Sequence, residues 1–155
     1  MIMFYLWKYF YQALFLSHPE IVVAQIKKAI KKNLGNPNTR KLLYKLFKSS
    51  PCIGDWIVKN APSLLFLLCS MKERTLLGVL IKDRKEVMQL QDKDGNTLLT
   101  YVSGCRGRTE RIVSMLVRDG WDREHANNKG ETARDRASKI KHWGILSQLG
   151  INSKS

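Results

Sequence analysis

The stretch DKDGNTLLTYV, residues 92–102, decides the fold of this chain. Its alternating oxygen-bearing side chains, Asp92, Asp94 and Asn96, are similar to the start of a helix–loop–helix calcium site. Such a site also needs a glycine at the sixth loop position and a bidentate glutamate at the twelfth. Counted from Asp92, these positions hold Thr97 and Ser103. Because the bend and the strongest ligand are both missing, we predict no metal site.

The same stretch fits a tight turn followed by a helix. The dipeptide Asp94-Gly95 is typical of a tight turn, and Thr97 is of a type that caps helix N-termini. Leu99 and Val102 then recur at helical spacing on one face. The pattern therefore predicts a turn, an N-cap and a helix that begins after Thr97.

A second copy of this pattern lies further along, in NNKGETARDRA at residues 127–137. Gly130 and Thr132 each follow their counterparts, Gly95 and Thr97, by 35 residues. A period of this length indicates a repeat array, in which each unit buries its apolar face only by stacking on a neighbour. The repeat therefore predicts the fold class.

These units resemble the ankyrin repeat, whose unit is a β-turn followed by two antiparallel helices, with a D-x-x-G-x-T-P-L-H-x-A opening. The middle unit matches it at Asp92, Gly95, Thr97, Leu99, Ile112, Val113, Met115 and Leu116. The next unit matches at Asn127, Gly130, Thr132, Ala137, Ile145, Leu146 and Leu149, and a weaker unit precedes both at residues 62–80. The resemblance implies an all-α, ankyrin-like solenoid of stacked helix-turn-helix pairs with short β-hairpin turns.

The chain departs from the family pattern at several positions. The family histidine, which ties each turn to its neighbour, is replaced by Phe66, Thr100 and Asp135 in successive units. The loop CRGRTER, residues 105–111, is two residues longer than the 33-residue period allows. We expect His125, just before the second turn, to make a structural turn contact.

Three regions are expected along the chain. Residues 1–60 form N-terminal helical pairs that are degenerate or capping repeats, residues 61–151 form the ankyrin-like repeats, and residues 152–155 form a tail. Upstream we predict an amphipathic helix at 19–33 and a helix pair at 40–47 and 53–58, so that about five pairs stack in all. The last pair is expected to cap the array with a polar face that contains Arg134, Arg136, Lys139 and Lys141.

The N-terminal run MIMFYLWKYFYQALFL, residues 1–16, is apolar and aromatic. It is shorter than the ~20 residues that span a bilayer, contains Lys8 near its centre and lacks a small-residue cleavage site. We predict a packed first helix. Contact with a membrane interface, and a signal or anchor, stay open as alternatives.

The cysteines favour an intracellular protein. Cys52, Cys69 and Cys105 are 17 and 36 residues apart, which matches no zinc spacing and leaves an odd thiol in any disulfide scheme. We therefore expect reduced thiols, with Cys69 buried, in a monomer located in the cytoplasm or nucleus; membrane association of the N-terminus stays open.

Charge is the second informative feature. The chain has 27 basic and 13 acidic residues, a net charge of +14, and residues 1–54 hold nine basic residues against one acidic residue. The helix QIKKAIKKNL places its lysines opposite an apolar stripe, in a basic patch of Lys27, Lys28, Lys31 and Lys32. Such a face is either simply solvated or meets acidic protein, anionic lipid or phosphate. Nucleic acid is disfavoured because no nucleic-acid-binding motif accompanies the charge.

A further group of arginines surrounds the middle unit. Its members are Arg106, Arg108, Arg111, Arg118 and Arg123. Because a guanidinium binds carboxylate or phosphate with two parallel hydrogen bonds, this group is a better binding candidate than the lysines.

No pattern of catalytic residues is present. His18, His125 and His142 are scattered, without a metal pair, a nucleophile elbow or a phosphate-binding glycine loop. We predict a non-catalytic chain without a cofactor.

The predicted function is protein–protein interaction, as an adaptor or regulator with a partner that has an acidic surface. The resemblance implies a recognition surface of hairpin tips and first-helix faces, here Lys93, Asp94, Asn96, Tyr101, Arg106, Trp121, Arg123, Lys129 and Glu131. An exposed Trp121 would be an interface anchor; the alternative is that it packs against a neighbouring turn. Two other functions stay open: a membrane-surface or nucleic-acid-associated protein that uses the basic N-terminal half, and a regulatory fragment of a larger ankyrin-containing protein.

Overall fold

The computed structural model describes residues 14–150, and every structural statement concerns that range. Within it the regular elements are α-helices and one 3-10 helix, with no strand, so the predicted all-α class is confirmed. The pattern of contacts divides the chain into two units, and the boundary between them falls between Leu64 and Leu65 in the sequence. The prediction of a packed first helix at residues 1–16 falls outside the described residues, except for the last three.

In the described part of the first unit, three helices each begin with a proline. They are α2 (Pro19–Asn33), α3 (Pro37–Ser49) and α4 (Pro51–Asn60). Proline suits the first helical turn because its missing N–H would have no partner there. The prediction for residues 19–33 is confirmed, whereas α3 and α4 begin earlier and end later than predicted. The Asn36 side chain caps α3 by accepting a hydrogen bond from the Asn38 N–H.

Apolar stripes hold these helices together. Val23, Ile26 and Ile30 of α2 are buried, as the amphipathic pattern predicted. The helices α2, α3 and α4 contact one another. The rings of Phe15 and Trp56 meet edge to face, with centroids 6.2 Å apart.

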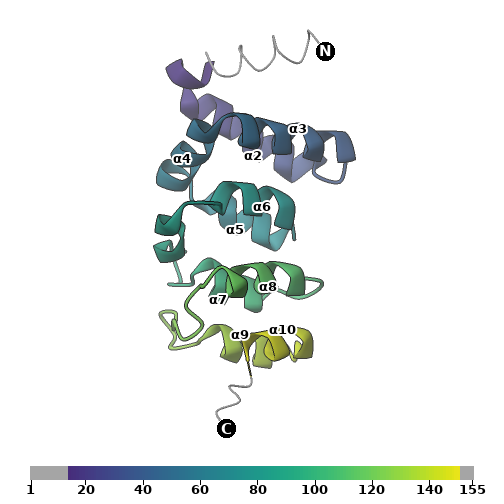
Figure 1. The fold of residues 1–155 in the computed structure, drawn as a ribbon, viewed down its shortest axis with the longest axis vertical. Helices are drawn as coiled ribbons and strands as arrows, with labels where there is room; N and C mark the ends of the chain where they lie inside the picture. The colour runs from purple at the N-terminus through teal and green to yellow at the C-terminus, as the bar shows by residue number, and fades with distance from the viewer. Residues whose placement is uncertain (1–13, 151–155) are drawn as a thin grey trace. The chain divides into compact units, whose positions relative to one another are not determined.

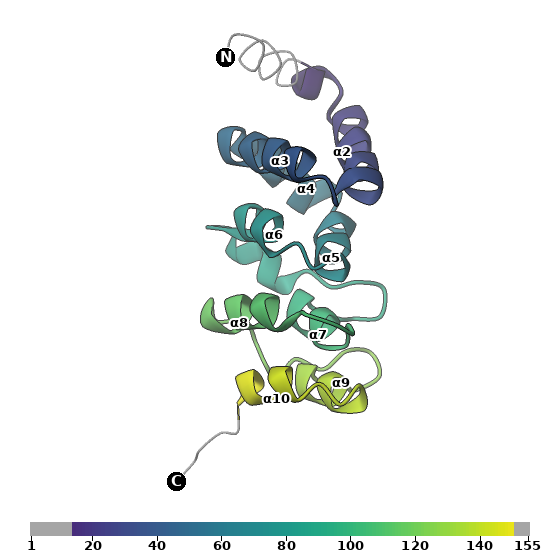
Figure 2. The same ribbon diagram turned by 90° about the vertical axis from the view of Figure 1, so that its right-hand side faces the viewer.

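The second unit contains three successive helix pairs (Figures 1 and 2). They are α5 (Ser63–Ser70) with α6 (Arg74–Ile81), α7 (Leu98–Ser103) with α8 (Glu110–Arg118), and α9 (Ala133–Lys139) with α10 (Trp143–Leu149). A 3-10 helix, η1 (Lys85–Gln89), lies between the first two pairs. The first helices α7 and α9 contact each other, and α8 contacts both α6 and α10. Each pair therefore packs on the next, first helix to first helix and second to second.

The predicted turn, cap and helix are confirmed at both repeats. Gly95 and Gly130 adopt φ angles of 77° and 73°, in the left-handed region that favours glycine. The Thr97 hydroxyl accepts a hydrogen bond from the Thr100 N–H and begins α7. Thr132 begins α9 in the same way, in a capping box with Asp135.

The core of the second unit consists of the apolar faces of these helices. Leu99, Val113 and Leu116 are fully buried, together with Leu77 and Leu80 of α6. All three cysteines are free, and Cys69 is buried as predicted. In the described part of the chain no single helix has the length and apolarity needed to cross a membrane; α4 and α5 meet that criterion only as a bent pair counted together.

Candidate binding surfaces

The first turn of the second unit is held together by one carboxylate. Asp92 Oδ1 accepts hydrogen bonds from the backbone N–H groups of Asp94 and Asn96, both at 2.9 Å. The Asn96 amide donates to Asp92 Oδ1 and Oδ2, at 3.1 and 2.9 Å. Asp92, the first of the residues that resemble calcium ligands in the sequence, therefore binds the N–H groups of its own turn.

The second turn repeats this arrangement with an amide in place of the carboxylate. Asn127 Oδ1 accepts from the backbone N–H groups of Lys129 and Glu131, at 2.9 and 3.0 Å. Asn127 follows Asp92 by 35 residues, the same interval that separates the two glycines. One local geometry is thus built twice by similar side chains.

Besides a long bond from the Asn128 amide to the Lys93 carbonyl, at 3.4 Å, three hydrogen bonds join the two turns. Asn127 Nδ2 donates to Asn96 Oδ1 at 2.9 Å, and the Asn128 N–H donates to the Asp94 carbonyl at 3.0 Å. His125 Nε2 lies 2.9 Å from the Gly95 carbonyl oxygen, so its predicted structural turn contact is confirmed. The turns are therefore one hydrogen-bonded surface.

The close approach of the turns requires a glycine at position 95. A Cβ atom built there would lie 2.3 Å from Asn128 Oδ1 and 2.9 Å from the Asn128 backbone nitrogen. The Thr100 hydroxyl donates to the His125 carbonyl at 3.5 Å, which adds a long contact between α7 and the segment before the second turn.

The predicted recognition residues differ in exposure. The exposed ones are Lys93, Asp94, Arg106, Arg123 and Lys129, the half-buried ones are Tyr101 and Glu131, and the buried ones are Asn96 and Trp121. Asn96 is only 2% exposed because its amide bonds the Asp92 carboxylate on one side and Asn127 on the other. Asn96 therefore joins the two turns. Its prediction as a partner-binding residue is corrected, because its side chain is not accessible to a partner.

Trp121 is also corrected, because only 5% of it is exposed. Gly120, at φ 86°, follows the end of α8, and the Trp121 N–H then donates to the Leu116 carbonyl at 3.2 Å. This is a Schellman end, in which the residue after the glycine commonly packs on the last helical turn. Trp121 packs into the fold, as the alternative interpretation held, and a glycine followed by a large apolar residue is the sequence signal for it.

The two half-buried residues of the surface have structural partners. The Tyr101 ring meets Phe66 edge to face, with centroids 5.3 Å apart, and burial raises the pKa of its hydroxyl. Glu131 is paired with Lys139 and lies 3.6 Å from Arg136 Nη1. The hydrogen bond from Lys139 is the main reason that the pKa of Glu131 is lowered.

The predicted basic patch lies on α2 of the first unit. Lys28, Lys31 and Lys32 are exposed and Lys27 is half-buried, opposite the buried apolar stripe. Ile21 is 47% exposed on the same helix. This face combines positive charge with one accessible apolar side chain.

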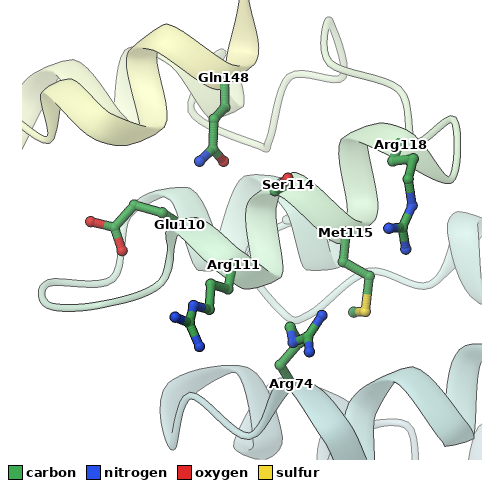
Figure 3. A pocket seen from close by; sticks show the side chains of 7 residues that line it. All are labelled: Arg74, Glu110, Arg111, Ser114, Met115, Arg118 and Gln148. Carbon is green, nitrogen blue, oxygen red and sulfur yellow. The ribbon is translucent and has the colours of Figure 1, made fainter.

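The third surface, which we call the arginine groove, was not predicted from the sequence. It is a hollow of about 350 Å³ lined by Arg74, Glu110, Arg111, Ser114, Met115, Arg118 and Gln148. Figure 3 shows the side chains of Arg74, Arg111 and Arg118 extending into the space between α6 and α8. The sequence placed Arg111 and Arg118 in one basic group, but only the packing of α6 on α8 brings Arg74 to them.

No protein-family model matches the chain, and no curated protein matches it significantly. Function is therefore inferred from these three surfaces.

Proposed function

We propose that the chain is a non-catalytic, ankyrin-like solenoid that binds an acidic protein partner through the exposed side chains of its two turns. The observation that carries this proposal is the hydrogen-bonded surface made by residues 92–97 and 127–132. Its bonds hold two turns from successive helix pairs in one arrangement. A surface that is already ordered loses less conformational entropy on binding than flexible loops do.

The ankyrin-like architecture is supported by three repeated features. The turn asparagine or aspartate, the glycine and the threonine cap each recur after 35 residues. Successive pairs pack first helix on first helix and second on second. This arrangement suits a repeat array, in which neighbouring units share one continuous core.

The exposed basic side chains are the part of the turn surface that an acidic partner would contact. Lys93 and Lys129 are exposed in the turns beside the exposed Asp94, and Arg106 is exposed at the other end of α7. Arg123 is exposed next to the second turn, between the exposed Asp122 and Glu124. Complementary charge accelerates association and excludes partners of the same sign.

One capture experiment tests the proposal. Lys93, Arg123 and Lys129 are replaced together by Ala, and a second variant replaces Lys27, Lys28, Lys31 and Lys32 by Gln. Each immobilised full chain is used to capture proteins across a range of salt concentrations. The turn variant should lose the main acidic partner, whereas the α2 variant should keep it with altered salt dependence, since distant exposed charges are screened. Trp121 is left intact because it is buried.

Circular dichroism of both variants provides the folding control, since the replaced side chains are exposed or half-buried. If the α2 variant loses the partner and the turn variant keeps it, the turn surface is not the recognition site.

A second candidate function uses the first unit at an anionic membrane surface. It is favoured by Ile21, which precedes Lys28 and Lys32 by seven and eleven residues and so shares their helical face. Leu42 of α3 is also 42% exposed in this unit. Exposed apolar side chains among lysines are typical of helices that lie in a lipid interface. Sedimentation with anionic but not with neutral vesicles, lost in the α2 variant, would support this function.

A further inference from the structure

The arginine groove lies on the second helices of the repeat pairs. Arg111, Ser114, Met115 and Arg118 share one face of α8, at intervals of three, four and seven residues. Arg111 and Arg118 are therefore about 10 Å apart along the helix axis, at about 1.5 Å per residue. Arg74, the first residue of α6, and Gln148 of α10 complete the lining (Figure 3).

The positive charge of the groove is poorly balanced by the protein. Within residues 14–150 no ion pair joins Arg74 or Arg111 to a carboxylate, and Arg118 has only Asp119, at 3.5 Å, with 75% of the Arg118 side chain exposed. Glu110 also lines the hollow, but Figure 3 shows its carboxylate pointing away from the arginines. Glu110 Oε1 lies instead 3.7 Å from His142 Nε2. Arg74 and Arg111 thus have no acidic partner in the described range, and the one pair of Arg118 is largely exposed to solvent.

Gln148 gives a second, independent indication of a ligand. Its Oε1 atom is buried and has no hydrogen-bond partner within the described chain. Figure 3 shows the amide directed from α10 toward α8, on the side where Ser114 lies. A buried oxygen without a partner is costly, and because it only accepts hydrogen bonds it suits a peptide N–H of a ligand, whereas the phosphate is left to the arginines.

We propose that the arginine groove binds a phosphorylated side chain in a segment of a protein partner. A phosphate monoester carries about −1.5 to −2 charges and three strong acceptor oxygens, and the fork of a guanidinium matches two of them at once. Three guanidiniums around one hollow supply more donors than a planar carboxylate can accept. Met115 also lines the hollow, and it is mostly buried.

The size and lining of the groove favour this ligand over other polyanions. A volume of about 350 Å³ is at the lower end for small-molecule pockets, which suits one phosphoryl group and its neighbouring residues. The lining contains no aromatic residue, whereas single-stranded nucleic acid is commonly held by bases stacked on aromatic rings. The groove is also separate from the turns, so this proposal does not rest on the turn surface as a recognition site.

The test uses the immobilised full chain and three pools of peptides of randomised sequence. The pools have phosphoserine, serine or glutamate at one central position. The native chain should retain the phosphoserine pool at least about tenfold more strongly than the other two, a difference of about 1.4 kcal/mol. In a variant with Arg74, Arg111 and Arg118 replaced together by Ala, retention of the phosphoserine pool should fall to that of the serine pool.

Two control variants separate the groove from general positive charge. Replacing Arg106, Arg108 and Arg134 by Ala removes the same number of exposed arginines elsewhere in the second unit, and the α2 lysine variant removes four charges from the first unit. Both should retain the phosphoserine pool. All of these side chains are exposed except that of half-buried Lys27, so thermal melting should be unchanged in every variant.

A third variant tests the geometry. Replacing Arg74, Arg111 and Arg118 by Lys keeps the charge but removes the bidentate fork, and should weaken retention severalfold. The proposal is overturned if the native chain retains all three pools equally. It is also overturned if either variant of Arg74, Arg111 and Arg118, with Ala or with Lys, retains the phosphoserine pool as strongly as the native chain does. A single-stranded RNA that binds more tightly than the phosphoserine pool and loses binding in the alanine variant would assign the groove to nucleic acid instead.

Discussion

The bond between the two turns can be tested by replacing Asn127 with Ala. Asn127 is 6% exposed, and its side chain makes four hydrogen bonds. Two are accepted from backbone N–H groups of its own turn, and two are donated, to Asn96 Oδ1 and Glu131 Oε2. The substitution therefore removes both the internal support of the second turn and its link to the first.

The magnitude follows from what each former partner can bind instead. Lys129 is exposed and Glu131 is half-buried, so their groups can turn to water, and each such bond contributes only about 0.5 to 1.5 kcal/mol. The Asn96 amide is 2% exposed, so its oxygen would be left without a partner at a cost of about 1 to 3 kcal/mol. The two backbone bonds and the unpaired Asn96 oxygen together give an expected loss of about 2 to 6 kcal/mol in the free energy of unfolding for Asn127→Ala.

Urea denaturation of the full chain measures this change, with circular dichroism and tryptophan fluorescence followed together so that coincident transitions verify two-state unfolding. Asn128→Ala is the matched control. Its exposed side chain makes only a long hydrogen bond to the Lys93 carbonyl, at 3.4 Å, so the loss should stay below about 0.5 kcal/mol. A double-mutant cycle of Asn96→Ala with Asn127→Ala should give a coupling of about 0.5 to 3 kcal/mol.

The reasoning is refuted if Asn127→Ala and Asn128→Ala unfold at the same urea concentration. Zero coupling in the cycle would show that the Asn96–Asn127 bond does not join the turns.

Three further predictions concern the same unit. Leu99→Ala should lower the free energy of unfolding by about 2 to 5 kcal/mol, because Leu99 is fully buried; a loss below about 0.5 kcal/mol in urea would place it outside the core. Calcium should leave the melting temperature unchanged, because Asp92 binds its own turn, whereas a calcium-dependent rise would show an ion bound by the folded state. Carboxyl NMR titration should find the pKa of Glu131 lowered by the hydrogen bond from Lys139, and that of Asp135 lowered by the Thr132 backbone N–H. Their stabilising contribution is full above the unfolded-state pKa and is lost as the pH falls through the folded-state pKa; unshifted values would contradict both contacts.

Most helices of this chain could be predicted because their signals are local. Pro19 begins α2 and the apolar stripe after it sets the buried face, so the bounds at residues 19–33 follow from neighbouring residues alone. Thr97 likewise begins α7 through a bond to an N–H three residues later. Boundaries were wrong at α3 and α4, where the starting prolines Pro37 and Pro51 were not used as helix starts.

Exposure was harder to predict than helix position. Asn96 and Trp121 both look like surface residues next to a turn, yet both are buried. Asn96 is covered because a turn from the next pair lies against it, and Trp121 because the chain after Gly120 folds back on Leu116. The exposed tryptophan of the second unit is Trp143, 75% exposed at the start of α10.

By itself, the sequence determined the all-α class and the turn-and-cap pattern, because helix caps and turns depend on residues within a few positions of one another. The 35-residue interval follows from comparing two such stretches of the sequence. Only the tertiary structure decided which polar side chains face water and which distant ones share a surface. Arg74 joins Arg111 and Arg118 in one groove because α6 packs on α8, and 37 residues separate Arg74 from Arg111. A local pattern can predict which face of a helix is buried, but it does not identify the remote side chains that share a surface with that helix.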